Sequence, residues 1–386
     1  ALAAAALPAL AAAWQDHQGD FPPDPRGVEA ARLALLADPI ASAVLDAAAT
    51  AAVRYLRDIA PDYAAAAQFG GAALDALANT DHPPHEVLIG KTVEAAGLAG
   101  ATALQEKLID TTLARGDLNA RQRAVFSGLR ADRLMRTGDL AEARRIREDE
   151  CLPAFEALGD TRAIALTRGQ IADILQARGD LAEARRILEA ECLPAYAALG
   201  DTREIAIARG KIADILQAQG DLAEARRIRE EECLPAFKAL GDTREVALTK
   251  GKIADILQAE GDLDGALAMH LDRLPVFQEM NDIDGIAHVR FSCAQLRLAR
   301  GEHERAGLQT IHDELAEAFA IQRHLQRPDG IGAVGALLGE VLAMGGHPAE
   351  AIDVLRKAAE AFAKIGQQGG VDQCNEVIAM IEARKD

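Results

Sequence analysis

Residues 168–187 read RGQIADILQARGDLAEARRI, and residues 209–228 read RGKIADILQAQGDLAEARRI. A third version, KGKIADILQAEGDLDGALAM, occupies residues 250–269, so the pattern recurs every 41 residues. A fixed period of this length is typical of a solenoid, because one unit cannot bury its apolar face alone whereas stacked neighbours can. The repeat therefore decides the fold.

One full unit, residues 200–240, reads GDTREIAIARGKIADILQAQGDLAEARRIREEECLPAFKAL. Each of its two Gly-Asp pairs marks a helix boundary, because glycine suits the left-handed position after a helix and aspartate suits the next N-cap. Asp201 with Glu204, and Asp221 with Glu224, fit a capping box. Apolar residues recur at helical spacing between these signals, which predicts two antiparallel helices. Pro235 lies within the second helix, as do its relatives Pro153, Pro194 and Pro275, and proline should bend each helix.

Counting outward from this unit divides the chain. We expect an N-terminal segment or linker over residues 1–26 and degenerate helical repeats over 27–118. An array of about six helix pairs should cover 119–368, with units at 119–158, 159–199, 200–240, 241–280, 281–326 and 327–368, followed by a capping helix over 369–386. Because the sequence does not begin with methionine, we also expect it to be part of a longer protein.

Composition and charge narrow the functional classes. Apolar residues make up 49% of the chain and aromatic residues only 3%, which favours helices packed through small side chains. A formal net charge of −18 argues against a nucleic-acid partner, which requires a basic surface. Three of the five cysteines (Cys151, Cys192 and Cys233) recur at the repeat spacing, as expected for core residues in a reducing compartment. This predicts a cytoplasmic location without a disulfide framework.

Motifs for chemistry are weak throughout. IGKT at residues 89–92 resembles the end of a phosphate loop, but His85 stands where that motif requires glycine. DHPPHE at residues 81–86 places two histidines beside carboxylates, and its prolines favour a rigid loop over a metal site. No serine, cysteine or threonine has a base at a defined spacing. We therefore predict no enzyme activity for this chain, and neither a cofactor nor a bound metal.

Charged residues also follow the repeat. The arginine pairs of the ARRI segments are neutralised by acidic residues at helical spacing, which indicates a solvated face. A polar ladder is the candidate binding surface. It consists of Asp132, Asp173, Asp214 and Asp255 at equivalent positions, Gln176, Gln217 and Gln258 one turn further along, and Lys211 and Lys252 on the same face, with Gln295 and Glu340 as its continuation.

Two interpretations of the ladder remain open. One is an acidic, hydrogen-bonding channel for a partner, and the other is a network that links neighbouring repeats; the two are compatible, because a solvated network can also bind. Recent duplication copies any residue, so the recurrence alone does not separate them. On the first interpretation, replacing Asp173, Asp214 and Asp255 together by asparagine weakens partner capture and leaves thermal stability nearly unchanged.

The LAEA sequence after each Gly-Asp pair, Ala184 and Ala225, and the small residues of GKIADIL resemble the tetratricopeptide repeat in a long variant. Leucines such as Leu175 and Leu216 replace the aromatic residues of the short consensus. The resemblance is strong over 119–368 and weak over 27–118, and it extends to the C-terminal sensor arrays of bacterial STAND and MalT-like signalling proteins. It implies an all-α, right-handed superhelical solenoid of antiparallel helix pairs. The first helix of each pair would line a concave groove, with Gly169, Gly210 and Gly251 as its smooth floor.

These observations predict a protein- or peptide-binding superhelix that is the sensor or scaffold part of a larger bacterial signalling or defence protein. One alternative is a target-recruiting array of an enzyme, a peptidase or an NTPase, whose catalytic domain lies outside this chain. Another is a small-molecule-sensing module. The expected partner is a protein or peptide with basic or polar groups rather than a nucleic acid or a membrane. Near-identical repeats also allow a homo-oligomer.

Overall fold

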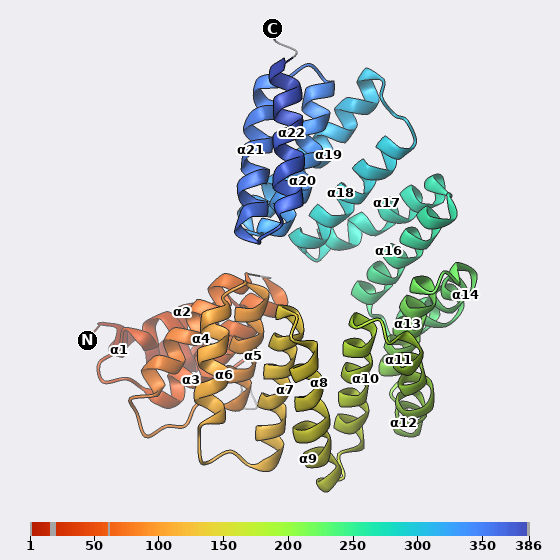
Figure 1. The fold of residues 1–386 in the computed structure, drawn as a ribbon. Coiled ribbons are helices and arrows are strands. Elements are labelled where there is room, and N and C mark those ends of the chain that lie inside the picture. Colours follow the sequence, from red (N-terminus) through yellow and green to blue (C-terminus); the bar gives the residue numbers. More distant parts are fainter. Residues whose placement is uncertain (1, 16–20, 61, 384–386) are drawn as a thin grey trace. The chain divides into compact units, whose positions relative to one another are not determined.

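The computed structural model describes residues 2–15, 21–60 and 62–383. Parts of the predicted N-terminal segment (residues 1 and 16–20) and of the C-terminal helix (384–386) lie outside the described residues. The described chain is helical and contains no strand (Figure 1). None of its helices combines the length and the apolar character needed to cross a membrane. The predicted class, an all-α solenoid of helix pairs, is confirmed.

The structure divides into two compact units, Ala1–Gly200 and Asp201–Asp386. In the first unit each helix packs against the next one along the chain. Its α-helices are α1 (Leu2–Trp14), α2 (Pro25–Leu35), α3 (Ser42–Arg54), α4 (Tyr63–Leu77), α5 (Glu86–Leu98), α6 (Thr102–Leu113), α7 (Ala120–Thr137), α8 (Leu140–Ile146), α9 (Leu152–Ala157), α10 (Thr161–Ala177), α11 (Leu181–Ile187) and α12 (Leu193–Leu199), with π-helical segments η1 (Tyr55–Ile59), η2 (Arg147–Cys151) and η3 (Leu188–Cys192).

The second unit continues in the same way, and its last helices pack in sequence from α16 to α22. It contains α13 (Thr202–Ala218), α14 (Leu222–Arg227), η4 (Ile228–Cys233), α15 (Leu234–Ala239), α16 (Thr243–Glu260), α17 (Leu263–Glu279), α18 (Ile283–Ala299), α19 (Arg305–His324), α20 (Pro328–Met344), α21 (Pro348–Lys364) and α22 (Gln368–Ala383). The predicted domain boundaries remain a prediction.

The Gly-Asp pairs form the boundaries that the sequence predicts. Gly200 and Gly220 adopt the left-handed conformation with φ of 65° and 87°. Asp201 then accepts a hydrogen bond from the backbone N–H of Glu204 at 3.1 Å, and Asp221 accepts one from Glu224 at 3.3 Å. The aspartates therefore satisfy donors that the first helical turn leaves without a partner.

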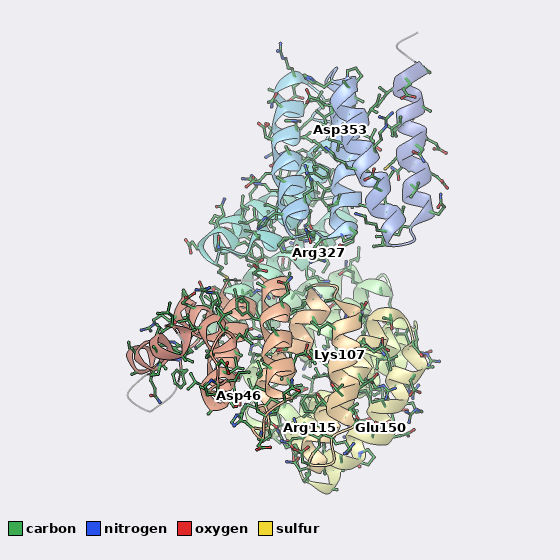
Figure 2. All side chains as sticks on the ribbon, turned by 90° about the vertical axis from the view of Figure 1, so that its left-hand side faces the viewer. Asp46, Lys107, Arg115, Glu150, Arg327 and Asp353 are labelled. Atoms are coloured by element: carbon green, nitrogen blue, oxygen red, sulfur yellow. The ribbon has the colours of Figure 1, made fainter. Side chains whose placement is uncertain are left out.

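Small side chains set the helix packing. One alanine in each second helix is fully buried at the repeat spacing, namely Ala143, Ala184, Ala225 and Ala266. Cys151, Cys192 and Cys233 are also buried, and each thiol donates to a backbone carbonyl of the first helix of its own pair, at 3.3, 3.5 and 3.4 Å. Their predicted core position is confirmed. Charged side chains such as Lys107 and Asp353 are exposed (Figure 2).

The bend that we expect at each proline of the second helices stays a prediction, but the structure shows two backbone settings for these prolines. Pro153, Pro194 and Pro235 each follow a π-helical segment, η2, η3 and η4. A π-segment holds one extra residue, and it relieves the ring clash and the lost hydrogen bond that proline imposes on an α-helix. Pro275 instead lies inside α17, which is α-helical throughout. Counting pairs from α7, the second helix of the fourth pair (α17) therefore differs from those of the first three pairs.

Candidate functional site

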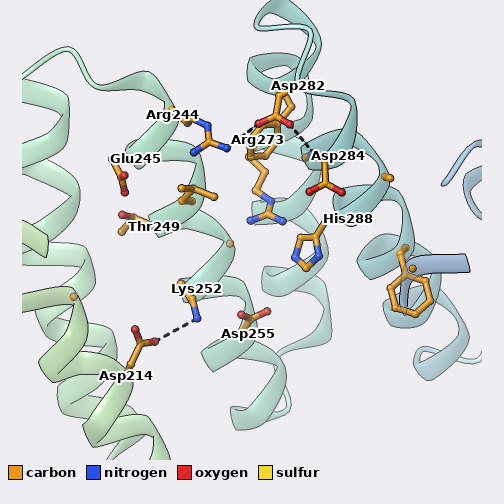
Figure 3. Close-up of a pocket in the computed structure, with 18 of the residues that line it drawn as sticks. Asp214, Arg244, Glu245, Thr249, Lys252, Asp255, Arg273, Asp282, Asp284 and His288 are labelled. Atoms are coloured by element: carbon orange, nitrogen blue, oxygen red, sulfur yellow. Dashed lines mark hydrogen bonds and ion pairs between the residues drawn. The ribbon is translucent and has the colours of Figure 1, made fainter. Parts of the chain in front are cut away.

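A cavity of about 760 Å³ opens within the second unit. Its wall comes mainly from α13, α16, α18 and α20, the first helices of four successive pairs (Figure 3). Apolar lining is provided by Phe237, Leu248, Phe277 and Phe291. Charged side chains from the same helices also line it, so the cavity offers both apolar contact and many hydrogen-bonding groups.

An ion pair connects the two helices of the third pair, which consists of α13 and of the second helix formed by α14, η4 and α15. The guanidinium of Arg229, on η4, donates to the Asp214 carboxylate on α13 at 2.6 Å and to the carbonyl of Gly210 at 3.3 Å. The Arg229 side chain is 5% exposed and that of Asp214 is 31% exposed. Lys252, on α16, lies 3.4 Å from the same carboxylate. Asp214 thus joins both helices of its own pair and the first helix of the next.

The same arrangement occurs in the first unit. Arg147, on η2, donates to Asp132 at 2.5 Å and to the carbonyl of Gly128 at 2.9 Å. There is no space for a side chain at Gly128, because a Cβ there would lie 2.5 Å from the Arg147 guanidinium. Gly128 therefore makes space for the buried Arg147.

The fourth pair departs from this pattern because its second helix is one residue shorter. Leu234 follows Leu222 by 12 positions, whereas Leu274 follows Leu263 by 11. Counted from the start of the helix, His270 takes the place of the paired arginine. Counted from the recurring Leu-Pro pair, Arg273 takes the place of the cysteine.

In the described part of the chain, Arg273 is a buried cation without a carboxylate partner. It is 3% exposed, and its Nε and Nη2 atoms have no hydrogen-bond partner among the described residues. The ring of Phe277 lies 5.6 Å from the guanidinium carbon, and a Cβ at Gly251 would overlap the guanidinium. Burial lowers the pKa of Arg273, and the negative charge of Asp255 only partly opposes this effect.

Two histidines adjoin this arginine. His270 is 1% exposed, and burial together with the charges of Arg273 and His288 lowers its pKa to about 3. His288 lines the cavity and its ring remains open to it (Figure 3). The surrounding wall removes much of its water, and this desolvation, followed by the charge of Arg273, lowers the pKa of His288. Both rings are therefore neutral near pH 7.

The other arginines that line the cavity already have carboxylate partners. Arg244 pairs with Asp282 at 3.1 Å, and Arg327 pairs with Asp284 at the same distance. The first pair connects α16 to the N-cap residue of α18, and the second connects α18 to the N-cap residue of α20, so both hold the cavity rim in shape.

The structure separates the residues of the predicted ladder. Lys211, Asp214, Lys252 and Asp255 line the cavity. Gln217 and Gln258 lie on the same helices but outside its lining, while Asp132, Asp173 and Gln176 lie in the first unit, on α7 and α10. Whether any of them binds a partner remains a prediction.

Sequence reasoning missed the buried arginines and the histidine. Arg147 and Arg229 recur directly after the ARRI segments, so their spacing was available as a signal. The ARRI arginines themselves form surface pairs as expected, for example Arg144 with Glu148 at 2.7 Å and Arg226 with Glu230 at 2.9 Å.

The DHPPHE loop serves a structural purpose. The His82 ring lies 3.0 Å from the Asp46 carboxylate, which also accepts from the His85 backbone N–H at 3.1 Å. His85 Nδ1 accepts from the backbone N–H of Val87 at 3.2 Å and so caps α5. No group of three or more His, Cys, Asp or Glu side chains is placed to hold a metal ion in the part of the chain that the structure describes.

Comparison with known families agrees with this architecture. The family model of the tetratricopeptide repeat matches residues 124–149, 165–190, 213–231 and 332–357. The chain contains tetratricopeptide repeats. Each matched stretch begins in the first helix of a pair, and three of the four belong to pairs with a second helix that carries a π-segment. No curated protein matches the sequence.

Solved structures share the fold at low identity. A Rap protein complexed with competence and sporulation factor matches with a TM-score of 0.55 and 12% identity, over 88% of this chain and 98% of its own. A STAND protein with a tetratricopeptide repeat sensor from Pyrococcus horikoshii matches with a TM-score of 0.54 and 13% identity, over 92% of this chain and 54% of its own. The Rap conjugation gene regulator of plasmid pLS20, in complex with a Phr peptide, matches with a TM-score of 0.53 and 16% identity, over 75% of this chain and 77% of its own.

Proposed function

We propose that the cavity of the second unit binds an extended peptide or a segment of a partner protein. The observation that carries this proposal is the lining itself, in which first helices of four successive pairs present charged and apolar side chains to one open space of about 760 Å³. A peptide in extended form needs hydrogen-bond partners for its backbone and pockets for alternate side chains. The charged groups of α16 and α18 supply the former, and the phenylalanines supply the latter.

The wider role that we propose is a sensor or scaffold within a larger bacterial signalling or defence protein of the cytoplasm. Three solved structures of similar fold support it. One Rap protein is complexed with competence and sporulation factor, another with the Phr* peptide, and the STAND protein has a tetratricopeptide repeat sensor. This role requires no catalysis by the chain. The same peptide-binding cavity could instead recruit targets for a catalytic domain elsewhere in the protein. Copies of the chain could also associate with one another, and neither case changes the proposed binding site.

A small-molecule ligand is the second candidate. The cavity volume falls within the range of about 300–1,000 Å³ that is usual for small-molecule sites. Four phenylalanines, Phe237, Phe277, Phe291 and Phe362, line it. The apolar lining that a small ligand requires is thus more extensive than the polar ladder alone indicated.

Selection of peptides by the full chain tests the first candidate. A phage-displayed library of random 12-residue peptides is panned against the whole protein, and selected peptides are measured by isothermal titration calorimetry. Leu248 lines the cavity and is 37% exposed, whereas Leu240 is 45% exposed outside the lining. We expect Leu248→Glu to weaken the selected peptides at least tenfold and Leu240→Glu to leave them within twofold of the unaltered chain.

Two outcomes would count against the proposal. If panning enriches no peptide, the cavity is not a peptide site, and a screen of small metabolites becomes the test of the second candidate. If Leu240→Glu weakens binding as much as Leu248→Glu, the peptides bind elsewhere on the chain.

A further inference from the structure

Arg273 stands out among the arginines that line the cavity. Arg229, Arg244 and Arg327 each have a carboxylate within 4 Å among the described residues. Arg273 has none there, although this residue is only 3% exposed and lines the same cavity. A buried guanidinium with unused donors is costly, because water no longer satisfies it.

The cost arises from the shorter second helix of the fourth pair. Loss of one residue brings Arg273 to the position at which Cys233 donates to a backbone carbonyl in the third pair. Gly251 leaves the space that the guanidinium occupies. The packing therefore accommodates the arginine in shape but not in hydrogen bonding.

We propose that Arg273, together with His288, forms a subsite that binds one carboxylate group of the segment held in the cavity. The guanidinium fork can donate two parallel hydrogen bonds to one carboxylate. In the pair of α13 and η4, Arg229 already donates one hydrogen bond to the Asp214 carboxylate, at 2.6 Å. This inference rests on the proposed function, since it names the chemistry of one contact between the cavity and its peptide.

The surroundings favour an anion of limited size. Arg273 on α17 and Lys252 on α16 contribute positive charge, and Asp255 on α16 and Asp284 on α18 contribute negative charge around His288. Figure 3 shows the Arg273 and His288 side chains directed into the same part of the cavity, with Asp255 below them. Asp255 repels a second negative group, so the subsite accepts a single carboxylate and not a cluster of them.

The bound carboxylate also acts on His288. A negative charge beside the ring opposes the effect of Arg273 and raises the pKa of the imidazole. Protonated His288 then donates a further hydrogen bond to the carboxylate. Binding is accordingly coupled to proton uptake at this one histidine.

The two sources of a carboxylate are an acidic side chain and the C-terminus of a peptide. We would titrate the full chain, labelled with ¹³C at its histidine rings, with three probes. N-acetyl-glutamate N-methylamide carries a side-chain carboxylate, N-acetylglycine carries a terminal carboxylate, and N-acetyl-glutamine N-methylamide is the neutral control. Signals of His288 are assigned with the His288→Gln variant.

We expect at least one carboxylate probe to shift the His288 ring signals and raise the pKa of this histidine, and the glutamine probe to leave them unchanged. Comparison of the two carboxylate probes identifies the preferred source. Arg273→Met should weaken the carboxylate probe at least tenfold, and Arg273→Lys should weaken it less. Arg226→Met removes a surface arginine outside the cavity and should leave probe binding within twofold.

Equal response to the glutamate and glutamine probes, or unchanged binding in both Arg273 variants, would overturn the subsite. Circular dichroism and the thermal midpoint of each variant verify that it folds. If Arg273→Met does not fold, Arg273→Lys still tests the subsite. Peptides that bind independently of Arg273 would leave the proposed function intact and remove this subsite. Carboxylate binding at Arg273 without any peptide capture would support the subsite and count against the proposed peptide-binding function.

Discussion

Replacement of Asp214 by asparagine tests whether the ladder is structural. The change keeps the size of the side chain and removes the charge that partners Arg229, whose side chain is 5% exposed. A hydrogen bond to a charged group contributes about 1.5–3 kcal/mol. The contact of the same carboxylate with the exposed Lys252 contributes about 0–1 kcal/mol. We therefore expect the second unit to lose about 2 kcal/mol of its unfolding free energy.

Asp255 provides the matched control. It occupies the equivalent position on the next first helix, is exposed, and has no ion pair within 4 Å among the described residues. Asp255→Asn should stay within about 0.5 kcal/mol of the unaltered chain. Arg229→Met in the Asp214→Asn background should recover most of the loss, because no buried charge then remains without a partner.

Repeat arrays do not always unfold in one cooperative step. Hydrogen exchange of the amides of α13 and η4 is therefore measured alongside urea unfolding of the full chain. Equal losses for Asp214→Asn and Asp255→Asn, or no recovery in the double variant, would refute the reasoning. The expectation that the three asparagine replacements leave stability nearly unchanged stays a prediction, and the pair of Asp214 with the buried Arg229 argues against it at that position.

Three further outcomes follow from the same contacts. Gly210→Ala should stabilise α13 by about 0.5–1 kcal/mol, because a Cβ there meets its nearest atom only at 3.9 Å. Gly261→Ala should destabilise the chain, because Gly261 has a φ of 88°, and urea unfolding compares the two variants. The pKa of His270 is about 6.5 in the unfolded chain and about 3 in the folded chain. The folded state is therefore favoured by neutral His270 above pH 6.5, and this contribution to stability is lost as the pH falls. His270→Leu should remove about 2 kcal/mol of the stability difference between pH 7 and pH 5, and an unaltered pH slope would contradict the assignment. Burial raises the pKa of the Cys151 and Cys233 thiols to about 11, so a thiol reagent at pH 8 should modify them only in denaturant, and rapid modification of the native chain would exclude their burial.

Local features of the fold were predictable because each depends on residues close in sequence. The 41-residue period, the Gly-Asp boundaries and the buried cysteines all follow from helix capping and apolar periodicity. The prolines were predicted to bend their helices, but the π-helical segments before them were not, because a single extra residue leaves the apolar pattern almost unchanged. The shorter fourth pair was visible in the spacing of Leu263 and Leu274, yet its effect on Arg273 was not.

The sequence by itself determined the helix pairs, their period and the surface charge pairs of the ARRI segments. These depend on capping and on contacts three or four residues apart, which local spacing encodes. Only the tertiary structure decided which aspartate of the ladder is paired and which is open. Asp214 and Asp255 have the same sequence context, but Asp214 accepts a hydrogen bond from Arg229, a buried arginine 15 residues away. In the fourth pair the second helix is one residue shorter, so His270 stands at the position of Arg229. Arg273 is then left without a carboxylate partner among the described residues. That distinction depends on which side chain of the second helix lies opposite each aspartate, and residues far apart in sequence decide this.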